Sequence, residues 1–131
     1  MKPTFIARAL FLFKTLSMKE YILLFRADYR DLAGVAAGET RERNNRWMDW
    51  IDDLVDKNHL SEGGNHLIPD GKILRNDGEI SVESLPENGE SILGYIMILA
   101  SSIHEAVELA KDCPILAGKG TSVEVREISN N

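Results

Sequence analysis

The stretch that decides the fold is Tyr21-Ile22-Leu23-Leu24-Phe25, a run of five apolar residues. Aromatic and β-branched side chains favour strands, and an apolar run without polar alternation is typical of a strand buried on both faces. A second run, Gly94-Tyr95-Ile96-Met97-Ile98-Leu99, has the same character. We therefore expect two central strands of one sheet.

Two other segments have the apolar spacing of helices. From Thr40 to Lys57, apolar residues recur every three or four positions, which predicts a helix that Asn58 ends. Ser102 and Glu105 have capping-box spacing and predict a second helix from Ile103 to Asp112. The expected buried stripes are Trp47, Trp50, Ile51, Leu54 and Val55 in the first helix, and Ile103, Ala106, Val107 and Ala110 in the second.

Turn residues dominate the segment between the first helix and the second apolar run. Asn76-Asp77-Gly78 separates segments 72–75 and 79–83 and predicts a hairpin. Residues 122–128 alternate and predict a last strand. The order is therefore strand, helix, hairpin, strand, helix, strand, which is that of an α+β, ferredoxin-like split βαβ protomer.

Such a protomer carries both helices on one face of its sheet. Because segments 21–25 and 94–99 are apolar on both faces, the uncovered face would be a large apolar patch, which monomers rarely expose. A second copy packed sheet against sheet would cover it, and two-fold dimers are the commonest oligomers. We therefore predict a homodimer.

Composition narrows the partners and the compartment. The 131 residues suit one domain, and the net charge of −6 argues against nucleic acid, whose phosphates require a basic face. Cys113 is the only cysteine, so neither an intrachain disulfide nor a cysteine-based zinc site can form, which indicates a reducing, cytoplasmic location. No His or Lys lies beside Cys113, and we expect it to be an apolar core residue.

Residues 1–17 differ from the rest of the chain because they carry Lys2, Arg8 and Lys14 and no acidic residue. Arg8 divides an apolar stretch that is too short for a membrane span of about 20 residues. No uninterrupted signal-peptide core or small-x-small cleavage site follows. We predict a poorly ordered N-terminal extension at 1–17, a domain at 18–131 and no membrane partner; an amphipathic surface helix is the alternative for the extension.

Three histidines are the candidate acid–base groups. His59 follows the predicted helix end and His104 opens the second helix, and both are expected to be exposed. His66 lies in Gly63-Gly64-Asn65-His66-Leu67, which we interpret as a loop whose glycines permit close backbone approach. There His66 either lines a pocket or forms a structural hydrogen bond. Asp70 is close in sequence, but nothing has metal-motif spacing, so neither a metal nor a cofactor is predicted.

Six segments carry a family resemblance: MKEYILLFR (18–26), RWMDWI (46–51), GGNHL (63–67), LGYIMILA (93–100), HEAVELAKDCPI (104–115) and VEVREI (123–128). In their order and spacing they resemble the YCII-related proteins, in the DGPF-motif branch. The resemblance covers Met18 to Ile128. It implies a ferredoxin-like protomer that forms a dimeric α+β barrel with a cleft near the dimer seam.

Two features of that family are missing here. The Asp-Gly-Pro-Phe motif aligns with Val82-Glu83-Ser84-Leu85. Other YCII-related proteins carry a first-helix His proposed to pair with an Asp as a catalytic dyad, whereas this helix has Asn44, Asn45 and Arg46 in that neighbourhood. None of these three is a good general base near neutral pH.

These losses favour a dimeric small-molecule-binding or accessory protein, and no catalytic residue is assigned. The alternative is a cofactor-independent isomerase- or lyase-type enzyme, of the kind that dimeric α+β barrels often host, with His66 or Asp70 as general base. Trp47 is a core residue first by its helical spacing, and a pocket residue second. Arg26 for charge, the Trp47 indole for stacking and the His66 imidazole would suit a small polar or anionic aromatic molecule. The candidate ligand-binding residues are Arg26, Trp47, Asn65, His66 and Asp70.

Overall fold

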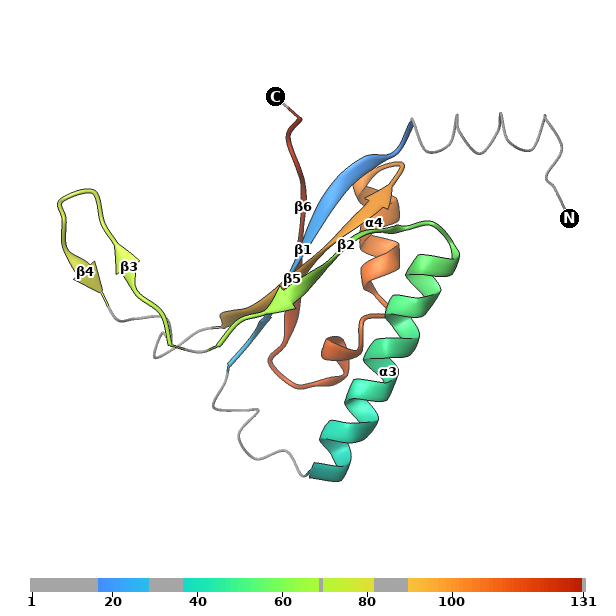
Figure 1. Cartoon of the computed structure of the whole chain (residues 1–131), viewed down its shortest axis with the longest axis horizontal. Helices are drawn as coiled ribbons and strands as arrows, with labels where there is room; N and C mark the ends of the chain where they lie inside the picture. The colour runs from blue at the N-terminus through green and yellow to red at the C-terminus, as the bar shows by residue number, and fades with distance from the viewer. Residues whose placement is uncertain (1–16, 29–36, 69, 82–89, 131) are drawn as a thin grey trace, which may run out of the picture.

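The computed structural model describes residues 17–28, 37–68, 70–81 and 90–130 (Figure 1). Residues 1–16 of the expected extension and positions 82–85, which align with the family motif, lie outside the described residues. The described elements are β1 (Lys19–Ala27), α3 (Ala37–Asp56), β2 (Leu60–His66), β3 (Ile73–Leu74), β4 (Ile80–Ser81), β5 (Ser91–Ala100), α4 (Ile103–Ala110), the 3-10 turn η1 (Pro114–Ala117) and β6 (Ser122–Glu127). The combination of helices with antiparallel strands confirms the α+β class.

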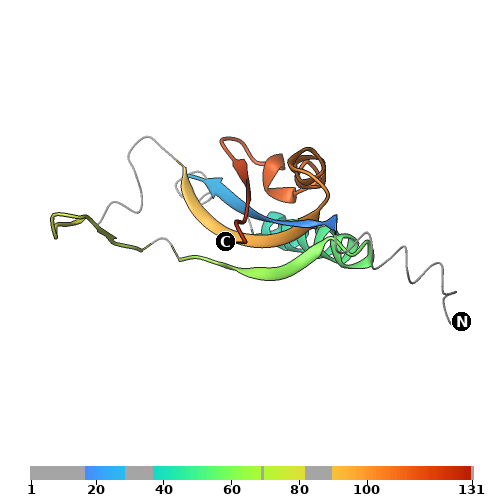
Figure 2. The same ribbon diagram turned by 90° about the horizontal axis from the view of Figure 1, so that it is seen from above.

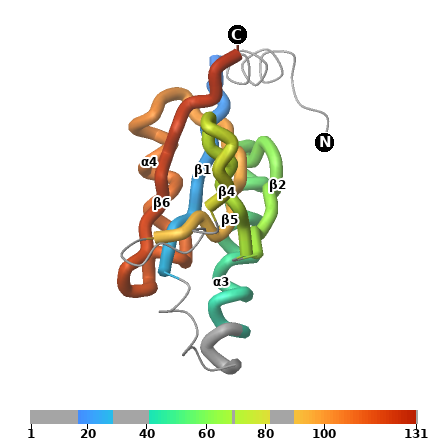
Figure 3. The backbone as a smooth tube through the Cα atoms, turned by 90° about the vertical axis from the view of Figure 1, so that its left-hand side faces the viewer, coloured from blue at the N-terminus to red at the C-terminus, as the bar shows by residue number. Residues whose placement is uncertain are grey.

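Four of the strands form one antiparallel sheet in the order β2-β5-β1-β6. The two apolar runs form its central strands, β1 and β5, as predicted. Side chains alternate along them: Tyr21, Leu23 and Phe25 are buried, whereas Ile22 and Leu24 between them are half-buried. Both helices lie on one side of the sheet (Figure 3), and the buried set packs in one cluster with residues of both helices. We call the other side the open face; its apolar side chains are Ile22, Leu24, Tyr95, Met97 and Leu99.

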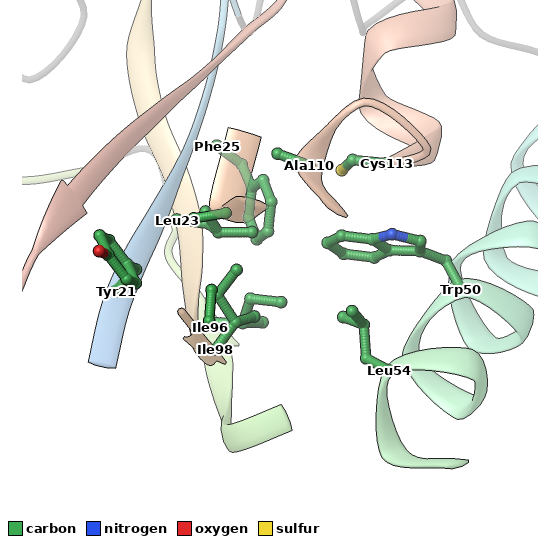
Figure 4. Packing of buried hydrophobic residues seen from close by; sticks show 11 residues of the cluster. Tyr21, Leu23, Phe25, Trp50, Leu54, Ile96, Ile98, Ala110 and Cys113 are labelled. Carbon is green, nitrogen blue, oxygen red and sulfur yellow. The ribbon is translucent and has the colours of Figure 1, made fainter. Parts of the chain in front are cut away.

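The core lies between the sheet and the two helices (Figure 4). Trp50 and Leu54 of α3 are 6% and 2% exposed, and the Trp50 indole donates a hydrogen bond to the Leu109 carbonyl oxygen at 3.2 Å. Ala106 and Ala110 are the buried residues of α4. Three positions expected in the buried stripes are exposed instead: Val55, Ile103 and Val107. Only the two alanines of α4 are fully buried; Leu109 packs half-buried against the core, whereas Ile103 and Val107 lie outside it.

Local signals predicted the end of α3 and the start of α4, whereas α3 begins at Ala37, before the expected Thr40, and α4 ends at Ala110, before the expected Asp112. Asn58 has a φ of 60° and turns the chain after α3, as expected of an asparagine in the left-handed region. The Ser102 hydroxyl accepts a hydrogen bond from the Glu105 amide at 3.2 Å. The Glu105 carboxylate accepts one from the Ser101 amide at 3.0 Å, one residue before the position that a capping box uses. None of the described helices is long and apolar enough to cross a membrane.

Strand β2 corrects the interpretation of residues 63–67 as a loop. Residues 60–66 pair with β5, with register shifts between Leu60 and Glu62 and between Glu62 and Asn65. β2 is an edge strand whose side chains are mostly exposed, so it needs no apolar alternation, and that alternation is the main sequence signal of a strand.

The predicted hairpin is present as β3 and β4, which form a separate two-stranded sheet. The Arg75 amide donates to the Glu79 carbonyl oxygen at 2.9 Å, and the Gly78 amide donates to that of Arg75 at 3.0 Å. These bonds close the turn at Asn76-Asp77-Gly78. The hairpin contributes no strand to the main sheet; β2 holds the edge position beside β5 instead.

Cys113 is a core residue, 3% exposed, as expected. Burial raises the pKa of the Cys113 thiol to about 12. The thiolate is the reactive species, and a rise of about three units removes about 1000-fold of it at neutral pH. We expect a disulfide reagent such as Ellman's reagent to label the native protein at least about 1000-fold more slowly than the urea-unfolded chain. Comparable rates would contradict the burial of this thiol.

Candidate functional site

The structure brings two of the candidate residues together. The Trp47 indole of α3 and the His66 imidazole of β2 have ring centroids 6.2 Å apart and planes inclined by 39°. Helix α3 is followed directly by β2, which runs back along it (Figure 1). The end of β2 therefore lies beside the middle of the helix, although the two residues are far apart in sequence.

Glycines on two strands permit this arrangement. Gly64 has a φ of +67°, and a Cβ atom built there would lie 1.7 Å from the Tyr95 carbonyl oxygen. A Cβ atom at Gly94 would lie 2.6 Å from the Asn65 carbonyl oxygen. Larger residues at either position would push β2 away from β5. The close backbone approach expected of the Gly63-Gly64 pair therefore occurs at Gly64.

A small cavity of about 70 Å³ lies beside the two rings. Phe25 and Trp47 form one of its walls, with ring centroids 4.8 Å apart in an edge-to-face arrangement. Trp47 also packs against Trp50 at 5.4 Å, so core contacts hold this wall in place. The lining residues are Phe25, Trp47, Gly63, Gly64, Asn65, His66, Tyr95 and Ile96.

The size of the cavity limits what it can enclose. A cavity of about 150 Å³ accommodates benzene, so this one is about half as large as a phenyl ring requires. It can enclose a group of a few heavy atoms, such as a carboxylate, a carbonyl or a methyl group. His66 is exposed and Trp47 is half-buried, so the remainder of a larger ligand would rest on their outer surfaces.

Few polar side chains line the cavity, namely those of Asn65, His66 and Tyr95. Asn65 and Tyr95 are directly opposed on β2 and β5, and the Asn65 side-chain amide donates to the Tyr95 hydroxyl at 3.3 Å. Because Tyr95 lies on the open face, this hydrogen bond lies across the sheet from the Trp47 indole. His66 supplies an imidazole. No carboxylate side chain of the described residues lines this cavity.

Arg26 and Asp70 lie elsewhere. Arg26 stands on β1 between the buried residues Phe25 and Ala27, so its side chain projects from the open face, away from Trp47. There its guanidinium pairs with Glu124 at 3.0 Å and with Glu90 at 3.5 Å. Asp70 is exposed beyond the end of β2 and does not line the cavity. The expected cleft of Arg26, Trp47 and His66 is therefore not assembled within one protomer.

Arg43 is the arginine on the same side as Trp47. It precedes Trp47 by four residues, which places it one helical turn away on the same face of α3, and it is half-buried. The position of Arg43 on this face could be predicted from the sequence, because positions 43, 47, 50 and 54 have the spacing of one helical stripe. The apolar pattern of the stripe begins at Trp47, so this pattern alone does not reveal the arginine one turn earlier.

His59 is buried, not exposed as predicted. It is 9% exposed, and its Nδ1 donates a hydrogen bond to the Leu99 carbonyl oxygen at 2.7 Å. Its backbone amide donates to Leu54 and its carbonyl oxygen accepts from Leu99. His59 comes directly before β2 and is buried at the edge of the sheet. Its hydrogen bonds to Leu54 and Leu99 give it a structural role. His104 is exposed as expected.

Tyr21 is a second buried titratable group. Burial raises its pKa above the ordinary value, and a hydrogen bond of 3.2 Å to the Glu127 carboxylate raises it further. A group whose pKa is raised on folding stabilises the protein while it stays protonated. That contribution is complete below about pH 10 and is lost as the pH rises above it.

A larger cavity of about 570 Å³ lies between α3 and the turn η1. Its charged side chains are of both signs, and two of them are already paired: Asp53 with Lys57 at 3.1 Å, and Lys111 with Glu108 at 2.7 Å. Its charged residues are Arg46 and Lys111 against Asp49, Asp53 and Asp112, so the surface carries mixed charge without a cluster of one sign. We therefore place the candidate site at the smaller cavity, where the aromatic rings of Phe25 and Trp47 lie beside the His66 imidazole.

Within the described residues, no group of three or more His, Cys, Asp or Glu side chains is placed to hold a metal ion. Comparison with known proteins adds no assignment: no family model matches the chain, and no curated protein matches it.

Proposed function

We propose that this chain is a cytoplasmic, homodimeric small-molecule-binding protein related to the YCII-related proteins. Its ligand site is the cavity between α3 and β2. The observation that carries the proposal is the contact of the His66 imidazole with the Trp47 indole at the mouth of that cavity.

The topology supports the ferredoxin-like part of the proposal. Without the β3–β4 hairpin, the element order is strand, helix, strand, strand, helix, strand, and the sheet order is β2-β5-β1-β6. In a split βαβ plan, a third strand separates the two strands that flank a helix. β5 occupies that place between β2 and β1, and the hairpin is an insertion.

The open face supports the dimer. Its central residues Ile22 and Met97 are directly opposed on β1 and β5, and both are half-buried although the helices lie on the other side. A second sheet packed against this face would complete the burial of both runs and give the dimeric α+β barrel.

The ligand class follows from the chemistry of the cavity. A volume of about 70 Å³ admits one small group, and the Trp47 and His66 rings offer a flat surface beside it. We assign Arg43, in place of Arg26, as the residue whose positive charge pairs with an anionic group of the ligand. The proposed ligand is therefore a small organic anion with a planar or aromatic part.

Binding is favoured over catalysis because His66 lacks an acidic partner there. A histidine general base is commonly oriented by a carboxylate that hydrogen-bonds its second nitrogen. None of the described residues that line the cavity is an Asp or a Glu, and Asp70 lies outside it.

Tryptophan fluorescence tests the site, because Trp47 lines the cavity and packs against Trp50. Titration with acetate, pyruvate and benzoate is expected to change the emission with a saturable dependence for at least one of them. His66→Ala should weaken that affinity about tenfold or more, since it removes one hydrogen-bonding partner and one ring face. His104→Ala, a change at an exposed histidine of α4, is the matched control and should bind like the unmodified protein.

Equal affinities for the two variants would refute the site. A native mass spectrum of freshly purified protein would show directly the number of subunits and any retained small molecule. A turnover whose pH–rate profile follows an imidazole and disappears in His66→Ala would replace the binding role by the enzymatic alternative.

A further inference from the structure

The β3–β4 hairpin is an exposed arm with an apolar face. Leu74 and Ile80 are directly opposed across its two strands, so their side chains lie on the same face. They are 73% and 62% exposed, and Ile68 at the base of the arm is 77% exposed. An isolated two-stranded hairpin is marginally stable in water, and exposed apolar pairs of this kind mark contact surfaces.

The arm projects on the side of the open face. In Figures 1 and 2 it stands apart from the rest of the described chain, on the side away from α3 and α4. Figure 3 looks at the sheet from that side and shows the hairpin in front of the strands, with the helices behind them. A molecule seated on the open face would therefore meet the arm as well.

The size of the open face favours a contribution from the arm. Its strands hold six to ten residues each. With strands about 4.8 Å apart and about 3.3 Å per residue, the face covers about 500 Å². Stable interfaces bury about 800 Å² of accessible surface on each partner, so further contact from the arm would enlarge an interface built on a footprint of this size.

We infer that the β3–β4 hairpin is a dimerisation arm that packs its Leu74–Ile80 face against the second copy of this chain. The inference rests on the proposed homodimer and extends it. In a two-fold dimer both arms are used, so four apolar side chains enter the interface. The arm adds contact area to that of the sheet face.

Sedimentation equilibrium tests the arm with a double variant, Leu74→Thr/Ile80→Thr. Threonine keeps the strand preference of the hairpin and removes most of its apolar surface. We expect the dissociation constant of the dimer to rise about 100-fold. Circular dichroism should show a folded protein, because both side chains are exposed in the protomer.

The matched control is Met48→Gln/Ile103→Gln. These side chains are 63% and 54% exposed, but they lie on α3 and α4, on the far side of the sheet. The control should dimerise like the unmodified protein. An unchanged dissociation constant in the arm variant would overturn the inference while leaving the homodimer in place. An unmodified chain that is monomeric at high micromolar concentration would overturn the homodimer, and the arm with it.

Discussion

Replacing Gly64 with alanine is expected to lower the melting temperature by about 10 °C. The φ of +67° costs an L-residue roughly 1–2 kcal/mol. The new Cβ would also lie 1.7 Å from the Tyr95 carbonyl oxygen, and because that atom belongs to the backbone, β2 must move, at about 1–3 kcal/mol. For a domain of this size, each kcal/mol shifts the melting temperature by roughly 3–4 °C.

The neighbouring Gly63 provides the control. A Cβ atom built there has no other atom within 4 Å. Gly63→Ala should therefore leave the melting temperature unchanged or raise it slightly, since alanine reduces the entropy of the unfolded chain. Thermal unfolding followed by circular dichroism compares the two. Equal losses in both variants would show that β2 does not approach β5 as described.

Moving β2 should also disturb the candidate site. Gly64 lies two residues before His66, and the contact of His66 with Trp47 depends on the path of this strand. Gly64→Ala is therefore expected to change the tryptophan emission of the folded protein, whereas Gly63→Ala should not. The same pair of variants tests the strand and the site together.

Substituting aspartate at two adjacent positions of β5 is expected to affect folding at one position and dimerisation at the other. Ile96 is 2% exposed and faces the helices, whereas Met97 is half-buried on the open face. Ile96→Asp places an unpaired carboxylate in the core at a cost of several kcal/mol, which is comparable with the whole stability of a domain. We expect that variant to be unfolded at neutral pH.

Met97→Asp should instead remain folded and become monomeric. In the proposed dimer, this position lies in the buried centre of the interface, and two like charges would come together there. We expect the dissociation constant of the dimer to rise more than about 1000-fold, which corresponds to about 4 kcal/mol. Sedimentation velocity and circular dichroism separate the outcomes. A Met97→Asp variant that dimerises as tightly as the unmodified protein would exclude the open face as the interface.

Much of the fold was predictable because its signals are local. The spacing of apolar residues in 40–57 predicts one helix. Asn58, Ser102 and the turn at residues 76–78 form their turns and hydrogen bonds with residues only a few positions away. Such interactions are formed within one segment, and the side-chain types alone specify them. The central strands were equally clear, because a strand inside a sheet has to be apolar.

β2, the strand that the sequence did not predict, had no such local signal. β2 reads Leu-Ser-Glu-Gly-Gly-Asn-His, and it is a strand only because β5 lies beside it. Its pairing is long-range, and an edge strand exposed to water can be polar. The error about His59 has the same origin, because that residue is buried through its contacts with the chain around Leu99.

The sequence by itself determined the types of the elements other than β2, the central position of β1 and β5 and the apolar character of both faces of these two strands. Only the tertiary structure decided which residues meet. The alternation of strand side chains sends Arg26 to the open face, to pair with Glu124. Two one-residue register shifts in β2 reverse its alternation twice, so His66 lies on the same face as the core residue Leu60 and meets Trp47. A single shift of one residue would have placed His66 on the other face, and the pairing of β2 with β5, which no local sequence pattern reports, decides the register.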